Sequence, residues 1–152
     1  MAEEIERKFL VKDDSWKRFA QGVAYKQGYM SAEHTIRVRT AGENAYLTIK
    51  GPTTGLTRPE FEYEIPHSDA LEMMEQLCRK PLVEKTRYII ESGSHKWEID
   101  VFEGDNEGLI IAEIELLYEN EPFEKPEWLG EEVSHDIRYR NSSLIDNPYC
   151  NW

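Results

Sequence analysis

The sequence has few cysteines, no long apolar run and no excess of positive charge, and each absence narrows what it can do. Its two cysteines, Cys78 and Cys150, stand far apart and belong to no CxxC or Cys/His pair at zinc-binding spacing. We therefore expect no disulfide framework and no zinc site, and two isolated thiols fit a reducing, cytoplasmic location. No run of about 18 apolar residues could span a membrane, and the acidic N-terminus lacks the apolar region of a signal peptide.

Basic residues are scarce relative to acidic ones. The 18 Lys and Arg residues face 30 Asp and Glu residues, which gives a formal net charge of −12 at pH 7. Non-specific binding to nucleic acid or to an anionic membrane needs a basic surface, so we expect neither as a partner. A polyanion could bind only at a local basic site that is screened from the acidic exterior. The 152 residues are expected to form one domain, residues 1–152, with its own core.

Most of the chain alternates polar and apolar residues with period two, which is typical of β-strands. Strands are predicted at residues 3–11, 26–31, 34–41, 44–50, 59–65, 81–91, 95–102 and 109–118. A short helix is predicted at 14–21 and a second after Ser68, an N-cap candidate. The buried stripe of the second helix is expected to comprise Ala70, Met74, Leu77 and Cys78. The pattern predicts a mainly β (α+β) fold, an eight-stranded antiparallel closed barrel with few helices, which leaves no exposed edges. The tail from Asn120 is not assigned.

Charged residues occupy one face of nearly every predicted strand, because residues two apart in a strand share a face. The first strand shows this in the stretch EIERKFLV, residues 4–11. The charged face carries Glu4, Glu6, Lys8, Arg37, Arg39, Lys50, Glu62, Glu64, Lys85, Arg87, Glu98, Asp100, Glu113 and Glu115. The opposite face is largely apolar and must be covered by helices, loops or a partner subunit, so a homodimer is permitted but not required.

A charged strand face ordinarily faces water, and for any one strand that is the simplest interpretation. The signs of the charges favour a lumen instead. Acids occur in pairs and bases in pairs, whereas a face shaped only for solubility would mix them because like neighbours repel. Paired carboxylates suit Mg²⁺ or Mn²⁺, and paired Arg and Lys suit phosphate oxygens. With Arg138 of the tail added, this face holds eight acids and seven bases and carries −1, which leaves −11 for the rest of the chain. We therefore predict a polyanion site in the lumen.

The motifs, taken in order, resemble those of the CYTH superfamily, the triphosphate tunnel metalloenzymes. The resemblance begins with the Glu-x-Glu-x-Lys motif of residues 4–8. It continues through KQGYM (26–30), IRVR (36–39), LTIK (47–50), EFEYEI (60–65), EKTRY (84–88), WEIDVF (97–102), AEIEL (112–116) and GEEVSHDIRYRN (130–141). It implies an eight-stranded barrel around a charged tunnel and divalent-cation chemistry on a triphosphate. The chain is most similar to short bacterial members that cleave inorganic tripolyphosphate.

The resemblance also implies roles for the charged face in a metal-assisted attack of water on a terminal phosphorus. The candidate catalytic residues are Glu4, Glu6, Lys8 and Lys85. The candidate phosphate-binding residues are Lys8, Arg37, Arg39, Lys50, Lys85, Arg87 and Arg138. The candidate ligands of Mg²⁺ or Mn²⁺ are Glu4, Glu6, Glu62, Glu64, Asp100, Glu113 and Glu115. The roles of Glu98, Tyr29 and Arg140 stay open at this point.

Three other functions remain compatible with the sequence. A nucleotide-directed enzyme, either an adenylyl cyclase or a nucleoside or thiamine triphosphatase, would need a base and sugar pocket, and no segment indicates one. A non-catalytic polyphosphate-binding module would have no use for so many carboxylates beside its bases, since their mutual repulsion in a narrow lumen is costly without metal. A structural barrel with a solvated charged face would tolerate the loss of Arg39.

Overall fold

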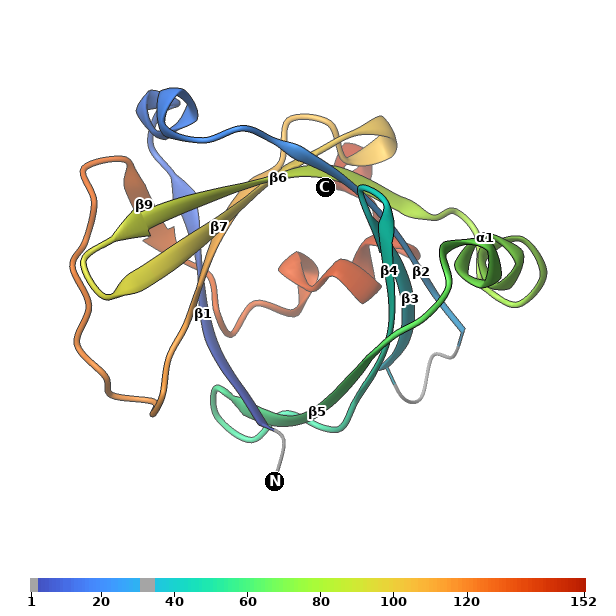
Figure 1. The fold of residues 1–152 in the computed structure, drawn as a ribbon. Helices are drawn as coiled ribbons and strands as arrows, with labels where there is room; N and C mark the ends of the chain where they lie inside the picture. The colour runs from blue at the N-terminus through green and yellow to red at the C-terminus, as the bar shows by residue number, and fades with distance from the viewer. Residues whose placement is uncertain (1–2, 31–34) are drawn as a thin grey trace.

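The protein forms a closed β-barrel, seen as a ring of strands in Figure 1, in a computed structural model that describes residues 3–30 and 35–152. The strands are β1 (Glu3–Val11), β2 (Val23–Tyr29), β3 (Thr35–Ala41), β4 (Asn44–Lys50), β5 (Thr57–Glu64), β6 (Val83–Ser92), β7 (His95–Phe102) and β8 (Ile110–Glu115). Their antiparallel order is β5-β4-β3-β2-β6-β7-β8-β1, and pairing between β1 and β5 closes the ring. The predicted eight-stranded antiparallel barrel is confirmed.

The predicted strands correspond to β1–β8, with ends that differ by up to three residues. The predicted strand ends at residues 31 and 34 lie outside the described residues. A short strand that the sequence did not predict, β9 (Leu129–Glu132), pairs with the last residues of β1. The edge of β1 that does not pair with β8 therefore has two partners: its first residues pair with β5 and its last residues pair with β9.

The helical regions are shorter than predicted. The stretch predicted at 14–21 is a single 3₁₀ turn, η1 (Ser15–Phe19), and the second helix is α1 (His67–Gln76). Because α1 ends at Gln76, Leu77 falls outside its buried stripe and is 59% exposed, so that part of the prediction is wrong. No helix within the described ranges combines the length and apolarity needed to cross a membrane.

Two of the three hydrophobic clusters among the described residues lie outside the barrel wall, because along most of their length the strands turn their charged faces inward and their apolar faces outward. The largest group of outward side chains is covered by β9, η1 and the segment between β8 and β9. Its buried members are Phe9, Trp16, Ile90, Trp97, Ile99, Ala112, Ile114, Leu116, Trp128 and Leu129. Helix α1 covers a smaller group on β3 and β4, which includes Val38 and Ala45. Ile49, Phe61 and Tyr63 on β4 and β5 stay exposed.

The C-terminal segment closes one end of the barrel. It contains the 3₁₀ turns η3 (Ile137–Tyr139), η4 (Asn141–Leu144) and η5 (Tyr149–Asn151), and Figure 1 shows it in red across the opening of the ring. At this end the inward-facing side chains are apolar, and the tail packs against them. The resulting cluster comprises Tyr29, Val83, Phe102, Leu109, Ile111, Val133, Tyr139, Leu144 and Ile145. We call this cluster the C-terminal plug.

Candidate active site

The barrel encloses a charged cavity of about 210 Å³, open at one side and bounded by the C-terminal plug. An eight-stranded barrel has room for packed side chains or for one small ligand. The cavity brings together most of the predicted site residues, namely Glu4, Glu6, Lys8, Arg37, Arg39, Lys50, Glu62, Lys85, Arg87, Glu113 and Glu115. Tyr29, Glu98 and Arg140, whose roles the sequence left open, line it as well.

Three predicted site residues lie elsewhere. Arg138, predicted to bind phosphate, points outward from η3 with its side chain 52% exposed and pairs with Asp136 at 2.8 Å. The resemblance, and not strand parity, put Arg138 among the phosphate-binding candidates, and in the structure it lies in a 3₁₀ turn. Asp100, predicted to bind metal, is fully buried behind the cavity wall and satisfied by Lys85 and Arg87. Glu64, also a predicted metal ligand, is exposed at the end of β5 and does not line the cavity.

The cavity also contains residues that the sequence reasoning missed. Arg58 and Glu60 precede Glu62 on β5 and share its parity, so extending the alternation by four residues would have found both. Asn141 and Ser142 come from the C-terminal segment and line the cavity too. No periodic signal marked them, because a 3₁₀ turn imposes neither the strand nor the helix repeat.

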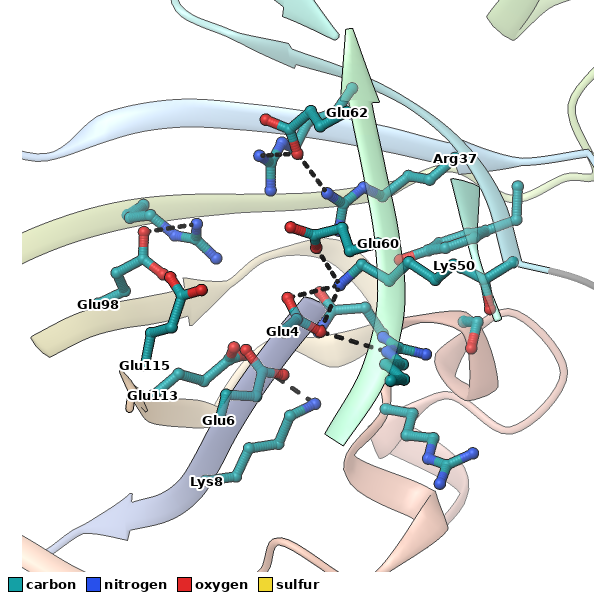
Figure 2. A pocket seen from close by; sticks show the side chains of 18 of the residues that line it. Glu4, Glu6, Lys8, Arg37, Lys50, Glu60, Glu62, Glu98, Glu113 and Glu115 are labelled. Carbon is teal, nitrogen blue, oxygen red and sulfur yellow. Dashed lines mark hydrogen bonds and ion pairs between the residues drawn. The ribbon is translucent and has the colours of Figure 1, made fainter. Parts of the chain in front are cut away.

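One wall of the cavity is acidic because of the strand register. The pairings place Glu6 opposite Glu115 and Glu98 opposite Glu113, so these carboxylates form a continuous group, visible at one side of Figure 2. Burial raises the pKa of Glu6 well above its usual range, and the charges of Glu113 and Glu4 raise it further. Burial, followed by the charges of Glu4 and Glu98, likewise raises the pKa of Glu115. The wall therefore favours protons or a cation.

A second group of charges, at the centre of Figure 2, is self-neutralising. The Lys50 Nζ lies 3.0 Å from the Glu4 carboxylate and 3.2 Å from that of Glu60, and Arg58 Nε lies 3.2 Å from Glu4. Burial by itself would raise the pKa of Glu4, but the adjacent Lys50 ammonium lowers it to about 2. Burial and the hydrogen bond and charge of Glu4 raise the pKa of Glu60 to about 7. Glu4 therefore holds Lys50 in place within the cavity.

The opposite wall is basic and incompletely satisfied. Arg37 and Arg39 both approach Glu62 at 3.6 Å through their Nη2 atoms. Their Nε–H groups are buried and have no hydrogen-bond acceptor within the described residues. A buried donor without a partner costs about 1–3 kcal/mol, and the single charge of Glu62 offsets only one of the two guanidinium charges on this wall.

Lys85 and Arg87 stand next to the plug and hold Asp100 between them. The Lys85 Nζ lies 2.8 Å from Asp100 Oδ2, and Arg87 Nε lies 2.7 Å from Asp100 Oδ1. Burial lowers the pKa of Lys85 to about 7, although the carboxylate of Asp100 opposes that shift. The pKa of Asp100 falls well below its usual range because these two cations outweigh the effect of its burial.

Comparison with known proteins agrees with this geometry. The CYTH domain family model matches residues 2–149. The chain belongs to the CYTH domain family. An inorganic triphosphatase of Acetivibrio thermocellus is 51% identical, covering 100% of this chain and 99% of the relative, and one of Nitrosomonas europaea is 37% identical over 93% and 95% of the two chains. A crystal structure of the inorganic triphosphatase NE1496 superposes on this CYTH domain with a TM-score of 0.65 at 34% identity, covering 95% of both chains. A putative adenylate cyclase from Bacillus halodurans shares only the fold, at 17% identity and a TM-score of 0.61 over 78% of this chain and 84% of that chain.

The family implies a divalent cation, and the acidic wall of this CYTH domain fits one. Its donors are all carboxylate oxygens, which Mg²⁺ and Mn²⁺ prefer. Burial and the neighbouring charges of Glu113 and Glu4 raise the pKa of Glu6, so a cation bound beside Glu6 would take the place of a proton. Within residues 3–30 and 35–152 no three acidic, His or Cys side chains already converge on one point. Glu6, Glu113 and Glu115 are the cavity residues that would hold the cation.

Proposed function

We propose that this CYTH domain hydrolyses inorganic tripolyphosphate to pyrophosphate and orthophosphate in the presence of a divalent cation. The observation that carries the proposal is the pairing of the two walls within one cavity. On one side, Arg37 and Arg39 of β3 line the cavity and share the carboxylate of Glu62, which leaves an excess of positive charge for an anion. On the other side, the raised pKa values of Glu6 and Glu115 favour a bound cation. A triphosphate with its bound cation meets both requirements. The two inorganic triphosphatase relatives, similar over nearly their whole lengths, support the same substrate.

In this proposal the basic side chains bind the phosphate oxygens and offset the charge that develops as the terminal phosphoanhydride bond breaks. These side chains are Lys8, Arg37, Arg39, Lys50, Lys85 and Arg87. Glu6, Glu113 and Glu115 would hold Mg²⁺ or Mn²⁺, which when bound neutralises phosphate charge and polarises the reacting groups. Glu4 acts on the reaction by orienting Lys50. Lys85, with a pKa near 7, is suited to exchange a proton with the attacking water.

The test measures phosphate release from tripolyphosphate, ATP and thiamine triphosphate, each with Mg²⁺, Mn²⁺ or EDTA. We expect cation-dependent release that is fastest with tripolyphosphate. Tyr29 is the one aromatic residue among the described residues that line the cavity, so it offers no slot in which a base could stack. Faster turnover of ATP would establish the nucleotide-directed alternative. Cation-dependent binding of tripolyphosphate without release would establish the binding module.

The positions of two tail arginines predict opposite results for similar substitutions. Arg140 lines the cavity and has no ion-pair partner within the described residues, whereas Arg138 lies outside and pairs with Asp136. We expect Arg140→Ala to raise the KM for tripolyphosphate by roughly 10-fold, the effect of losing one charge-assisted hydrogen bond. Arg138→Ala is the matched control and should leave both kcat and KM unchanged. A raised KM in Arg138→Ala together with an unchanged KM in Arg140→Ala would instead assign the phosphate contact to Arg138.

We also propose that its partners are small polyanions and not nucleic acids or membranes, since the basic side chains are gathered inside a chain whose net charge is −12. Two free cysteines support a reducing, cytoplasmic location. A homodimer would use the exposed apolar residues Ile49, Phe61 and Tyr63, and sedimentation velocity of the wild type and of Phe61→Ser tests for it.

A further inference from the structure

A network of polar side chains connects three elements at the closed end of the cavity. Beyond its contact with Asp100, Lys85 Nζ on β6 donates to Asn141 Oδ1 at 2.9 Å. The same oxygen of Asn141 accepts from Gln27 Nε2 at 3.1 Å, and Gln27 Nε2 also donates to the Tyr29 hydroxyl at 2.7 Å. One amide oxygen from the C-terminal segment therefore links Lys85 to Tyr29.

The lysine determines the direction of every hydrogen bond in this network. A protonated Lys85 can only donate, so the Asn141 atom that faces it is the carbonyl oxygen. That oxygen requires the NH₂ group of Gln27 to face it, and the same NH₂ group then donates to the Tyr29 oxygen. The O–H proton of Tyr29 is consequently directed away from Gln27. Because Tyr29 lines the cavity, its O–H can donate a hydrogen bond to a ligand oxygen.

Two acceptors also determine where the remaining position of the Lys85 nitrogen points. The tetrahedral Nζ atom is bonded to Cε and has three further directions for an N–H bond or a lone pair. Hydrogen bonds to Asp100 and Asn141 use two of these positions. The third is the position left for a ligand in the cavity that Lys85 lines, and it is an N–H in the protonated state and a lone pair in the neutral state. If Asp100 were the only acceptor, the second N–H and the lone pair of the neutral amine could exchange places by rotation about the Cε–Nζ bond. Asn141 removes that freedom.

The side-chain amide of Gln27 is buried although only one of its two polar atoms is hydrogen-bonded. Its side chain is fully buried, and its Oε1 has no donor within the described residues. A buried unsatisfied carbonyl costs stability, so something other than stability has to account for its position. The two bonds donated by Nε2, to Asn141 and to Tyr29, supply a reason.

We infer that Asn141 is a positioning residue of the active site, which acts directly through Lys85 and through Gln27 on Tyr29. The inference rests on the proposed function, which gives Lys85 a phosphate oxygen or the attacking water to meet. Asn141 can act in this way because the plug holds its neighbours rigidly, with Tyr139, Leu144 and Ile145 all buried. The C-terminal segment thus contributes to the chemistry as well as closing the barrel.

The test compares tripolyphosphate kinetics across three asparagine variants. Misplacing a reacting group by about 1 Å can cost roughly 100-fold in rate, so Asn141→Ala should lower kcat by roughly 10- to 100-fold and change KM by less than about 3-fold. Asn141→Asp keeps an oxygen at the same place and should recover much of kcat, while its added charge raises KM. Asn147→Ala removes an exposed asparagine from the same segment and should match the wild type.

A double-mutant cycle separates positioning from a merely structural role. In a Lys85→Met background, Asn141→Ala should lower kcat by no more than about 3-fold, because its main route of action is gone. An equal effect in both backgrounds, or a kcat for Asn141→Ala within about 2-fold of wild type, would overturn the inference. If the wild type hydrolyses no triphosphate, the proposed function fails by itself. The inference is then decided by ¹⁵N relaxation of the Lys85 side chain, and unchanged order in Asn141→Ala would refute it.

Discussion

Glu6→Gln is expected to abolish nearly all turnover while making the cation-free protein more stable. The activity should fall roughly 100-fold or more, because the change removes a carboxylate from the group that would hold the divalent cation. The stability gain has a different origin. Glu6 is half-buried beside Glu113 and Glu4, and its pKa in the folded protein lies well above the unfolded value.

The raised pKa gives this prediction a pH dependence of definite sign. The folded state binds a proton at Glu6 more tightly than the unfolded state, so the free energy of unfolding falls as pH rises from about 4.3, the unfolded pKa, through the folded pKa. A neutral glutamine has no such loss, so the variant should be more stable than the wild type in EDTA at pH 8 and similar at pH 4. Mg²⁺ should raise the melting temperature of the wild type at pH 8 and do so far less in Glu6→Gln.

The measurement is thermal unfolding at several pH values with EDTA or Mg²⁺, combined with phosphate release. Glu72→Gln removes an exposed carboxylate on α1 and serves as the control for the change in net charge. Wild-type turnover in Glu6→Gln would remove Glu6 from the cation site. If the variant were less stable than the wild type in EDTA at pH 8, repulsion between the carboxylates of Glu6, Glu113 and Glu4 would not be destabilising the folded protein.

Trp97→Ala should have the largest effect on stability, without altering the chemistry of the molecules that remain folded. The Trp97 side chain is fully buried outside the barrel and packs edge to face against Phe9, Phe123 and Trp128, with ring centroids 5.5–5.7 Å apart. Deleting a buried tryptophan costs about 3–5 kcal/mol. For a chain of this size we expect a fall in melting temperature on the order of 10 °C.

Trp97→Phe is the matched control. It keeps an aromatic ring, and it sacrifices no hydrogen bond, because the indole Nε1 has no acceptor within the described residues. Urea unfolding should show a smaller loss than for the alanine variant. Turnover per folded molecule at low temperature should equal that of the wild type for both, since Trp97 lies on the face opposite Glu98. Loss of specific activity in either variant would show that the outer core controls the inner wall.

Strand parity predicted the inner wall well because it depends only on local geometry. Once β1 exists, Glu4, Glu6 and Lys8 must share a face, whatever the rest of the chain does. The same rule could not predict which inward residue pairs with which. Asp100 has the parity of a cavity residue, yet Lys85 and Arg87 both reach it from β6, and that depends on side-chain contacts across strands.

The plug was missed for a related reason. Its inner residues follow strands in which the alternation breaks, as at Val101–Phe102 and Ile110–Ile111, where both faces become apolar. This break marks the depth at which the lumen stops being polar. The sequence shows it, but what fills that end is a tail of 3₁₀ turns with no periodic pattern. Asn141 was missed for the same reason, and no repeat in the tail indicated that Arg138 would lie outside the cavity.

Because the strands turn charged residues inward and apolar residues outward, mutations that affect ligand binding and mutations that affect stability fall at alternate positions of the same strands. The inward-facing residues determine which ligand can bind, and the outward-facing residues between them stabilise the barrel by hydrophobic packing. Substitutions at one set can therefore accumulate with little effect on the other, and a barrel of this kind can be adapted to a new anion while its scaffold is kept. A single-residue insertion or deletion within a strand is different. It exchanges the two sets beyond that point, placing carboxylates in the outer core and aromatic rings in the lumen, so we expect length changes to be confined to the loops.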